Sequence, residues 1–215
     1  EESRARELAA ASLLYAENQP DRALLLALES LAIDDTFEGQ NALLTGLLTQ
    51  SQLAGYFNGH TDFIRTIAIS NDGTRLATGS RDSEVIIWDA EQRISLFELI
   101  AHEVRVNVVA FNHDGTRLVS ADGLGRIIIW DTSTGDIMQE LSINDEEIRS
   151  AEFSPDGTHL AIGNSKGDIA WWSLTDNDEA TLIEAHAGGV IYDLAFSPDG
   201  AIMATAGDDN SIQLW

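Results

Sequence analysis

Cysteine is absent from this chain of 215 residues. A chain without thiols has no disulfide framework, no thiolate metal site and no cysteine nucleophile. The absence suits a reducing compartment, so we expect a cytoplasmic protein whose fold does not depend on cross-links.

Positive charge is also scarce, because 12 Lys and Arg residues stand against 36 Asp and Glu residues, for a net charge of −24. Such a chain repels phosphate backbones and anionic bilayers. We therefore expect neither nucleic acid nor a membrane surface among its partners.

Long hydrophobic runs are missing as well. No apolar stretch approaches the roughly 20 residues that span a bilayer, and the first residues, "EESRARELAAASLLYAEN", are acidic and amphipathic rather than a signal sequence. The sequence predicts a soluble chain. Because it starts at Glu1 without Met and stops at Trp215 inside an apolar run, we also expect a piece of a longer protein.

What the sequence does contain is a repeat. The stretches "NDGTRLATGSRDSEVIIWD", "HDGTRLVSADGLGRIIIWD", "PDGTHLAIGNSKGDIAWWS" and "PDGAIMATAGDDNSIQLW" align without gaps up to their final tryptophans. The turn glycines and these tryptophans both recur at spacings of 42, 42 and 43 residues. Four units therefore share one register.

Each unit is predicted to consist of strands only. An alternating segment such as "VNVVAF" is followed by an Asp-Gly turn, a small-residue segment and an apolar run such as "VIIW" or "IIIW". Runs that are apolar on consecutive residues need cover on both faces, as in a sheet between neighbouring sheets. The pattern predicts small antiparallel meanders that stack around an axis.

This pattern resembles WD40 repeats, in which Gly-His or Ala-His opens a unit and Trp-Asp closes its third strand. The resemblance covers roughly residues 52–215 and implies a mainly β fold of propeller blades. In that family a His before the first strand, a Ser or Thr on the second, an Asp in the next turn and the Trp form a buried hydrogen-bonded set. The resemblance assigns these roles, blade by blade, to His60, Thr78, Asp82 and Trp88; His102, Ser120 and Trp130; Trp172; and His186, Thr205, Asp209 and Trp215.

Two of the units depart from the family pattern. In the second, Leu124 occupies the position of the Asp, so we expect a partial network. The third keeps only its Trp, and we expect packing alone to hold that blade. Its other residues at the polar positions are Asn144, Ile162, Lys166 and Ser173.

Residues 1–51 differ in composition and predict helices near 3–17, 20–33 and 36–50, with Pro20 in a first turn and Asp35 or Thr36 as a cap. The phrase "QPDRALLLALESL" resembles the tetratricopeptide-like segment ahead of WD40 propellers in bacterial signalling ATPases of the STAND class. The resemblance implies a recognition module of a larger bacterial signalling protein. The resemblance does not imply ATP binding by this chain, because "GNSKGD" lacks the glycine and lysine spacing of a Walker motif.

The number of blades is small for this family. "SQLAGYFNG" fits an outermost strand, and three full units and a last unit of three strands follow it, for a total of four blades. We expect either part of a seven- or eight-bladed ring or two chains that pair to make eight blades.

Other candidate sites are weak. No His pair has zinc spacing, and His113 and His159 lie in or beside Asp-Gly turns, so we expect them to face solvent. The acidic runs at 176–179 and 208–210 do not reproduce a calcium loop. We expect no metal and no cofactor. A repeated set of His, Asp and hydroxyl residues resembles a hydrolase triad, but its recurrence once per blade favours a structural role.

In the WD40 family, positions near the start of each first strand line one face, the top face, that binds partners. Three arginines and two aromatic residues fall there, which favours a contact with a protein, such as an acidic segment. Salt bridges between neighbouring blades account for the arginines equally well. The positions are Phe63, Arg65, Arg105, Asn107, Glu147, Arg149, Val190 and Tyr192.

The sequence leaves three functions open. The first is a non-catalytic scaffold or sensor that binds a protein or peptide and communicates with upstream domains. The second is an oligomerisation scaffold, since exposed blade edges invite further strands. The third is a hydrolase, for which no residue pair outside the blade networks offers an activated nucleophile.

Overall fold

The computed structural model describes residues 2–15, 20–34, 36–49, 56–143, 146–175 and 180–215. The chain divides into two compact units, Glu1–Tyr56 and Phe57–Trp215, close to the boundary at 51/52 expected from composition. No helix within the described ranges is long and apolar enough to cross a bilayer.

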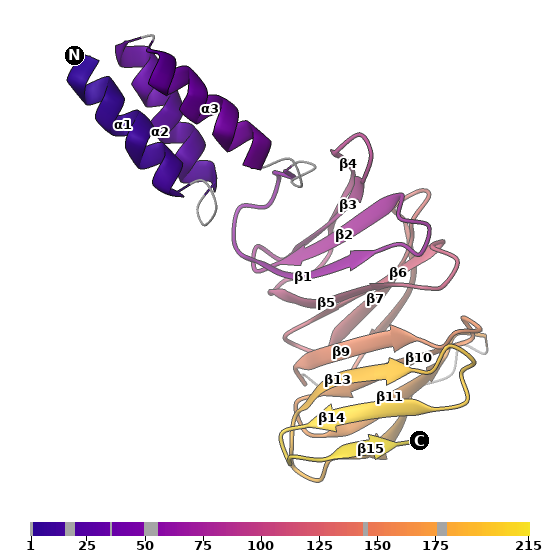
Figure 1. Ribbon diagram of the computed structural model, residues 1–215. Coiled ribbons are helices and arrows are strands. Elements are labelled where there is room, and N and C mark those ends of the chain that lie inside the picture. The colour runs from indigo at the N-terminus through magenta and orange to yellow at the C-terminus, as the bar shows by residue number, and fades with distance from the viewer. Residues whose placement is uncertain (1, 16–19, 35, 50–55, 144–145, 176–179) are drawn as a thin grey trace. The chain divides into compact units, whose positions relative to one another are not determined.

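The first unit contains three helices among its described residues, α1 (Glu2–Tyr15), α2 (Pro20–Ile33) and α3 (Phe37–Thr49) (Figure 1). α2 begins at Pro20, as expected, and the backbone N–H of Gly39 donates to Thr36 Oγ1 at 3.1 Å, so Thr36 caps α3. Buried alanines on all three helices, among them Ala9, Ala27 and Ala42, let the helices approach closely.

The second unit contains four antiparallel sheets among its described residues, three with four strands and one with three, and they follow one another in chain order (Figure 1). The predicted mainly β fold of propeller blades is therefore confirmed. The strands of the blades are β1 (Ile64–Ile69), β2 (Arg75–Ser80), β3 (Glu84–Asp89) and β4 (Ile94–Ile100); β5 (Val106–Phe111), β6 (Arg117–Asp122), β7 (Arg126–Asp131) and β8 (Ile137–Ser142); β9 (Ile148–Phe153), β10 (His159–Asn164), β11 (Asp168–Ser173) and β12 (Thr181–Glu184); and β13 (Ile191–Phe196), β14 (Met203–Gly207) and β15 (Ile212–Leu214).

The expected strand before the first His is not found in its described part. Residues 51–55 lie outside the described residues, and residues 56–59 form no strand. Phe57 instead packs edge-on against Trp88, with ring centroids 5.5 Å apart, and covers part of the first sheet.

The core lies between successive sheets. The second-strand and third-strand residues of one blade pack against the inner strand of the next, as Ile169 of the third blade does against Ile191 and Leu194 of the fourth. This arrangement explains the consecutive apolar residues of β3 and β7, whose two faces are both buried.

The two terminal blades each present an apolar face. On β1, Ile67 is 63% exposed, whereas its counterparts Val109 and Leu194 are each 5% exposed against a neighbouring blade. On β15, Ile212 is 74% exposed, whereas its counterpart Ile169 is fully buried. These faces have the composition of the internal contacts between blades.

The Asp-Gly turns between first and second strands are built on one pattern. Gly157 has a φ of 69°, and Asp156 accepts hydrogen bonds from the Ser154 hydroxyl and the Thr158 backbone N–H at 2.6 and 3.0 Å. The hydrogen bonds to the carboxylate of Asp156, led by the Ser154 hydroxyl, lower its pKa to about 2. The same Ser-x-Asp-Gly geometry recurs in the first and fourth blades.

Candidate functional site

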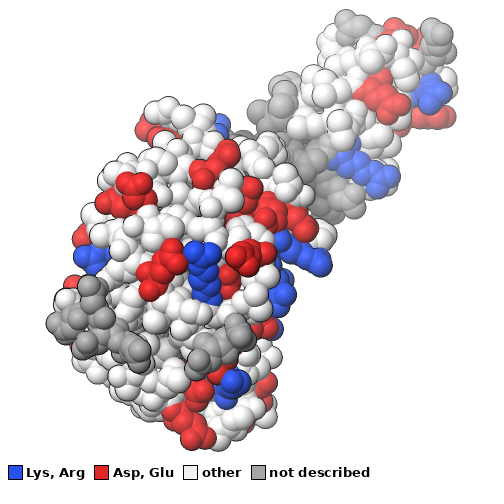
Figure 2. All heavy atoms as spheres, turned by 180° about the vertical axis from the view of Figure 1, so that it is seen from behind, with Lys and Arg blue, Asp and Glu red and all other residues white. Residues whose placement is uncertain are grey.

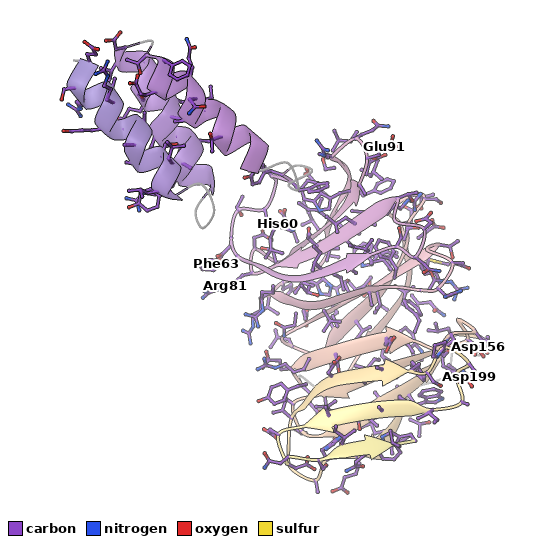
Figure 3. The ribbon with its side chains drawn as sticks, viewed as in Figure 1. His60, Phe63, Arg81, Glu91, Asp156 and Asp199 are labelled. Carbon is purple, nitrogen blue, oxygen red and sulfur yellow. The ribbon has the colours of Figure 1, made fainter. Side chains whose placement is uncertain are left out.

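The candidate site lies at the ends of the inner strands, β1, β5, β9 and β13. His60 and Phe63 lie at the end where the inner strands begin, and Asp156 and Asp199 lie in turns at the opposite end (Figure 3). We call the first end the top face and the second the turn face. A buried polar network in each blade holds the top face in place.

The first blade has the network expected from the family. The indole N–H of Trp88 donates to Thr78 Oγ1 at 2.8 Å, and His60 Nε2 lies 2.8 Å from the same oxygen. His60 Nδ1 lies 3.0 Å from Asp82 Oδ2, which also accepts the backbone N–H of Thr61. The set ties the loop before β1 to β2 and β3.

These contacts determine the tautomer of the histidine. A carboxylate only accepts, so the Nδ1 that faces it carries the proton. The threonine oxygen already accepts the indole N–H, and its own hydrogen then has His60 Nε2 as its acceptor. The hydrogen-bond pattern assigns a neutral imidazole with Nδ1–H, because only this form gives every buried hydrogen a partner.

The expectation of a partial network in the second blade is wrong. Leu124 is 48% exposed, but Asp122, two residues earlier, lies 2.8 Å from His102 Nδ1, and Ser120 joins His102 to the Trp130 indole. Asp122 also accepts the backbone N–H groups of residues 124 and 126 at 2.9 and 3.0 Å. Burial alone would raise the pKa of Asp122, but these hydrogen bonds outweigh it and lower the pKa below its ordinary value of 3.8.

The expectation that packing alone holds the third blade is also wrong. Asn164, at the position of Asp122, accepts two backbone N–H groups through Oδ1 at 3.0 and 2.9 Å, and its amide nitrogen donates to the buried carboxylate of Glu146. Lys166 donates to the other oxygen of Glu146. Donor and acceptor have exchanged sides: an amide replaces the carboxylate, and a carboxylate replaces the imidazole. Asn144 lies outside the described residues, and Ile162 offers the Trp172 indole no hydroxyl.

The fourth blade has the expected partners in a more open setting. His186 lies 2.9 Å from both Thr205 Oγ1 and Asp209 Oδ1, and the Trp215 indole donates to Thr205 at 3.1 Å. The side chain of Asp209 is 30% exposed. Asp208, in the same acidic run, accepts the backbone N–H of Val190 at 2.7 Å, so this residue has a structural role at the start of β13. The acidic run at 176–179 lies outside the described residues.

The networks do not have the form of a catalytic or metal centre. Thr78, Ser120 and Thr205 are at most 3% exposed, so no substrate reaches the hydroxyl that a hydrolase would use as its nucleophile. His60, Asp82 and Glu84 place three possible ligand atoms within 4.8 Å of one another. Both ring nitrogens of His60 already serve Thr78 and Asp82, so we assign this cluster to the blade network.

Two of the three arginines of the top face, Arg65 and Arg105, pair across blades, and Arg149 pairs within its own blade. Arg65 Nε donates to Asn107 Oδ1 at 2.9 Å, while Arg105 and Arg149 both bind Glu147, at 2.7 and 3.0 Å. Burial alone would raise the pKa of Glu147, but the hydrogen bond from Arg105 and the charges of both arginines hold it below its ordinary value. The set links the first three blades.

The aromatic residues of the top face remain open to solvent. Phe63 is 73% exposed and Tyr192 is 56% exposed, and Val190, two residues before Tyr192, is half-buried. The site therefore combines a fixed polar centre with exposed rings on the first and fourth blades.

The two remaining histidines behave differently. His113 is exposed, as expected. His159 is not simply solvent-facing, because its ring stacks on Trp171 with centroids 4.9 Å apart and an interplanar angle of 23°.

Sequence reasoning missed Asp122, Asn164 and Glu146 because it searched at a fixed spacing from the second-strand hydroxyl. A usable signal exists: Asp122 and Asn164 both lie two residues after that position, whereas Asp82 and Asp209 lie four residues after it. The four blades therefore use two alternative acceptor positions.

Comparison with known proteins agrees with this geometry. A family described as IFT122 first beta-propeller matches residues 39–215. Among curated relatives, the small ribosomal subunit protein RACK1z of Arabidopsis thaliana is 35% identical over 57 residues, which are 26% of this chain and 17% of that protein. The Lissencephaly-1 homolog of Caenorhabditis briggsae is 45% identical over 47 residues (21% and 12%), and the methylosome protein WDR77 of Xenopus laevis is 35% identical over 48 (22% and 14%).

Each of these alignments spans less than a fifth of the relative's length. The family match, in contrast, covers most of this chain, including every blade described above. The chain belongs to the family of the IFT122 first beta-propeller, and its sheets are WD40 propeller blades.

Proposed function

We propose that the chain is a non-catalytic platform that binds a protein or peptide on its top face. The observation that carries the proposal is the pairing of exposed aromatic rings, Phe63 and Tyr192, with arginines whose positions are already fixed. Aromatic residues and arginine are enriched at the points that contribute most to protein interfaces. A network that is formed before binding loses little side-chain entropy when the partner arrives.

The charges of this centre favour an acidic segment as the ligand. Two guanidinium groups, of Arg105 and Arg149, share the single carboxylate of Glu147, and Arg65 pairs with the neutral amide of Asn107, so positive charge remains unbalanced. Elsewhere acidic side chains are spread over the visible surface, with basic ones lying singly among them (Figure 2). A local positive field on an acidic protein would orient an acidic partner.

The wider setting that we propose is a larger bacterial signalling protein of the STAND type, in which the helices connect the blades to upstream domains. The support is the tetratricopeptide-like composition of the helical unit and its position ahead of the blades. The names of two relatives assign them to assemblies, the small ribosomal subunit and the methylosome, and this agrees with a binding role. We propose a cytoplasmic location for the same reason as before, the lack of cysteine.

Charge reversal tests the top face. The variant Arg65→Glu, Arg105→Glu, Arg149→Glu places new carboxylates beside Glu147, and we expect it to reduce capture of the native partner from cell extract by at least about tenfold. Capture is measured by quantitative mass spectrometry against the unmodified chain. Circular dichroism shows whether the variant remains folded.

The control changes the same net charge at exposed arginines elsewhere, Arg4→Glu, Arg22→Glu and Arg93→Glu. It should capture the partner as the parent does. Equal capture by both triple variants would remove the top face from the proposal.

Self-association is a second candidate, favoured by the apolar faces at Ile67 and Ile212. Either face could accept the other from a second copy, because both have the composition of an internal blade contact. Sedimentation at micromolar concentration decides this point, and a strict monomer rejects the candidate.

A further inference from the structure

The turn face holds a cavity lined by residues that the four blades contribute at matching positions. The cavity, of about 310 Å³, lies where the inner strands of all four blades end, and its walls include Phe111, Phe153 and Phe196. These three phenylalanines hold the same position on β5, β9 and β13, the last residue of the strand. Three of the four blades therefore contribute a phenylalanine to the lining of one pocket. Each of the three also packs against a core cluster between blades, and Phe153 is only 5% exposed.

One residue of this pocket breaks the repeat. Glu152 lines the cavity, whereas the matching positions on the other inner strands carry alanine: Ala68, Ala110 and Ala195. Ala68 and Ala110 pack against core clusters between blades, so the blade itself does not require a carboxylate at this position. A half-buried acidic side chain is costly without a partner, and its presence needs another reason.

The neighbours of Glu152 satisfy it only in part. Its Oε2 accepts the backbone N–H of Phe196 at 3.2 Å, and within the described part of the chain Oε1 has no hydrogen-bond partner. Burial raises the pKa of Glu152, and the negative charge of Asp193 on β13 raises it further against the effect of the Phe196 hydrogen bond. His113, the other titratable residue of the lining, is exposed at the rim. A cation in the pocket would offset the burial of this carboxylate.

We propose that the turn-face pocket binds a lysine or arginine side chain of a partner polypeptide, with its charged end on Glu152 and its alkyl stem among the three phenylalanines. Aromatic rings and a carboxylate together suit this ligand, because the stem is apolar and the charged end gains from both an anion and ring faces. The net charge of −24 would draw basic segments toward the protein. This site is separate from the top face, at the opposite end of the inner strands (Figure 3).

The test titrates the whole chain with a capped five-residue peptide that has one central lysine, and NMR monitors the binding. A salt concentration of about 0.15 M screens long-range electrostatic attraction. We expect saturable shifts of the backbone signals of Glu152 and Phe196. Norleucine in place of lysine keeps the stem and loses the charge, and it should weaken binding at least about tenfold. An arginine peptide shows whether the pocket prefers a guanidinium group, and binding of either cation supports the proposal.

Two variants remove the carboxylate, Glu152→Ala and Glu152→Gln. The first gives β9 the residue that the other inner strands carry, so we expect it to fold. Both variants should weaken binding of the lysine peptide at least about tenfold. The control, Glu98→Gln, removes one negative charge from an exposed residue of β4 and should leave the affinity within about twofold of the parent's.

The triple arginine variant of the top face should bind the lysine peptide as the parent does, which keeps the two sites distinguishable. The proposal is overturned if the unmodified chain shows no saturable shifts up to about 10 mM peptide. It is equally overturned if norleucine binds as well as lysine, or if Glu152→Gln binds as well as the parent.

Discussion

Gly167→Ala is expected to lower the free energy of unfolding by about 3 kcal/mol or more. Gly167 has a φ of 88°, and a Cβ at this position would lie 1.8 Å from the carbonyl oxygen of His186 and 2.4 Å from that of Gly189. The carbonyl of Gly167 also accepts the backbone N–H groups of Ala185 and His186. The substitution therefore strains the turn and displaces the loop that carries His186 into the fourth blade.

Gly157→Ala is the matched control. Gly157 has a similar φ of 69°, but a Cβ there would meet nothing within 4 Å, so only the backbone strain of about 1 kcal/mol remains. Urea denaturation of both variants measures the difference. Equal losses would mean that the loop before the fourth blade is not held against the third as described.

The second large effect is expected from Asp122→Ala, which should lower the free energy of unfolding by about 3 kcal/mol. The change leaves the Nδ1–H of His102 and the backbone N–H groups of residues 124 and 126 without their acceptor in a buried setting. A buried donor without a partner costs more than the hydrogen bond contributed. Urea denaturation at neutral pH measures the loss.

Asp209→Ala makes the same change in the fourth blade, where the carboxylate is open to solvent and water can replace it. We expect a smaller loss there. The effect at Asp122 should also depend on pH. Its folded pKa lies below 3.8, so its contribution is present at neutral pH and is lost as the pH falls through the folded pKa.

The difference in the free energy of unfolding between the parent and Asp122→Ala should therefore become smaller below about pH 4. A gap that stays constant down to pH 3 would contradict the ionised state assigned to this carboxylate. Equal losses from Asp122→Ala and Asp209→Ala at neutral pH would contradict the role given to burial.

The blades could be predicted from the sequence because local patterns that repeat determine their strands. The alternating segment "VNVVAF" forms β5 from its first to its last residue, and the turn glycines have the positive φ that the Asp-Gly pattern requires. Thr36 and Pro20 begin helices for equally local reasons.

The polar networks could be predicted only in part, because hydrogen bonds fix the positions of atoms and not the spacing of residues. A carboxylate two residues early, at Asp122, reaches the same imidazole nitrogen as one in the turn. In the third blade the donor and the acceptor changed places together, at Asn164 and Glu146, so the residues at the family's own positions, Asn144 and Lys166, indicated only a loss.

Glu152 went unnoticed because it lies ahead of the stretch from the Asp-Gly turn to the tryptophan on which the units were aligned. Its counterparts Ala68, Ala110 and Ala195 keep the spacing of the repeat, so the same alignment extended toward the N-terminus would have found it.

The top face illustrates how one set of residues fits two interpretations. Arg65 and Arg105 form the inter-blade pairs that a structural role predicts, and these pairs, with that of Arg149 inside its own blade, also fix the arginines in position for a ligand. The exposed rings of Phe63 and Tyr192 favour the second role, because packing within the described blades does not cover them.

The most direct test of the central claim is the tautomer of the three network histidines, His60, His102 and His186, read from the ring nitrogen signals in NMR at neutral pH. The buried networks require Nδ1–H facing the aspartate and a bare Nε2 that accepts the Ser or Thr hydroxyl. We predict this neutral form at all three positions. A proton on Nε2, with Nδ1 bare, would contradict the account.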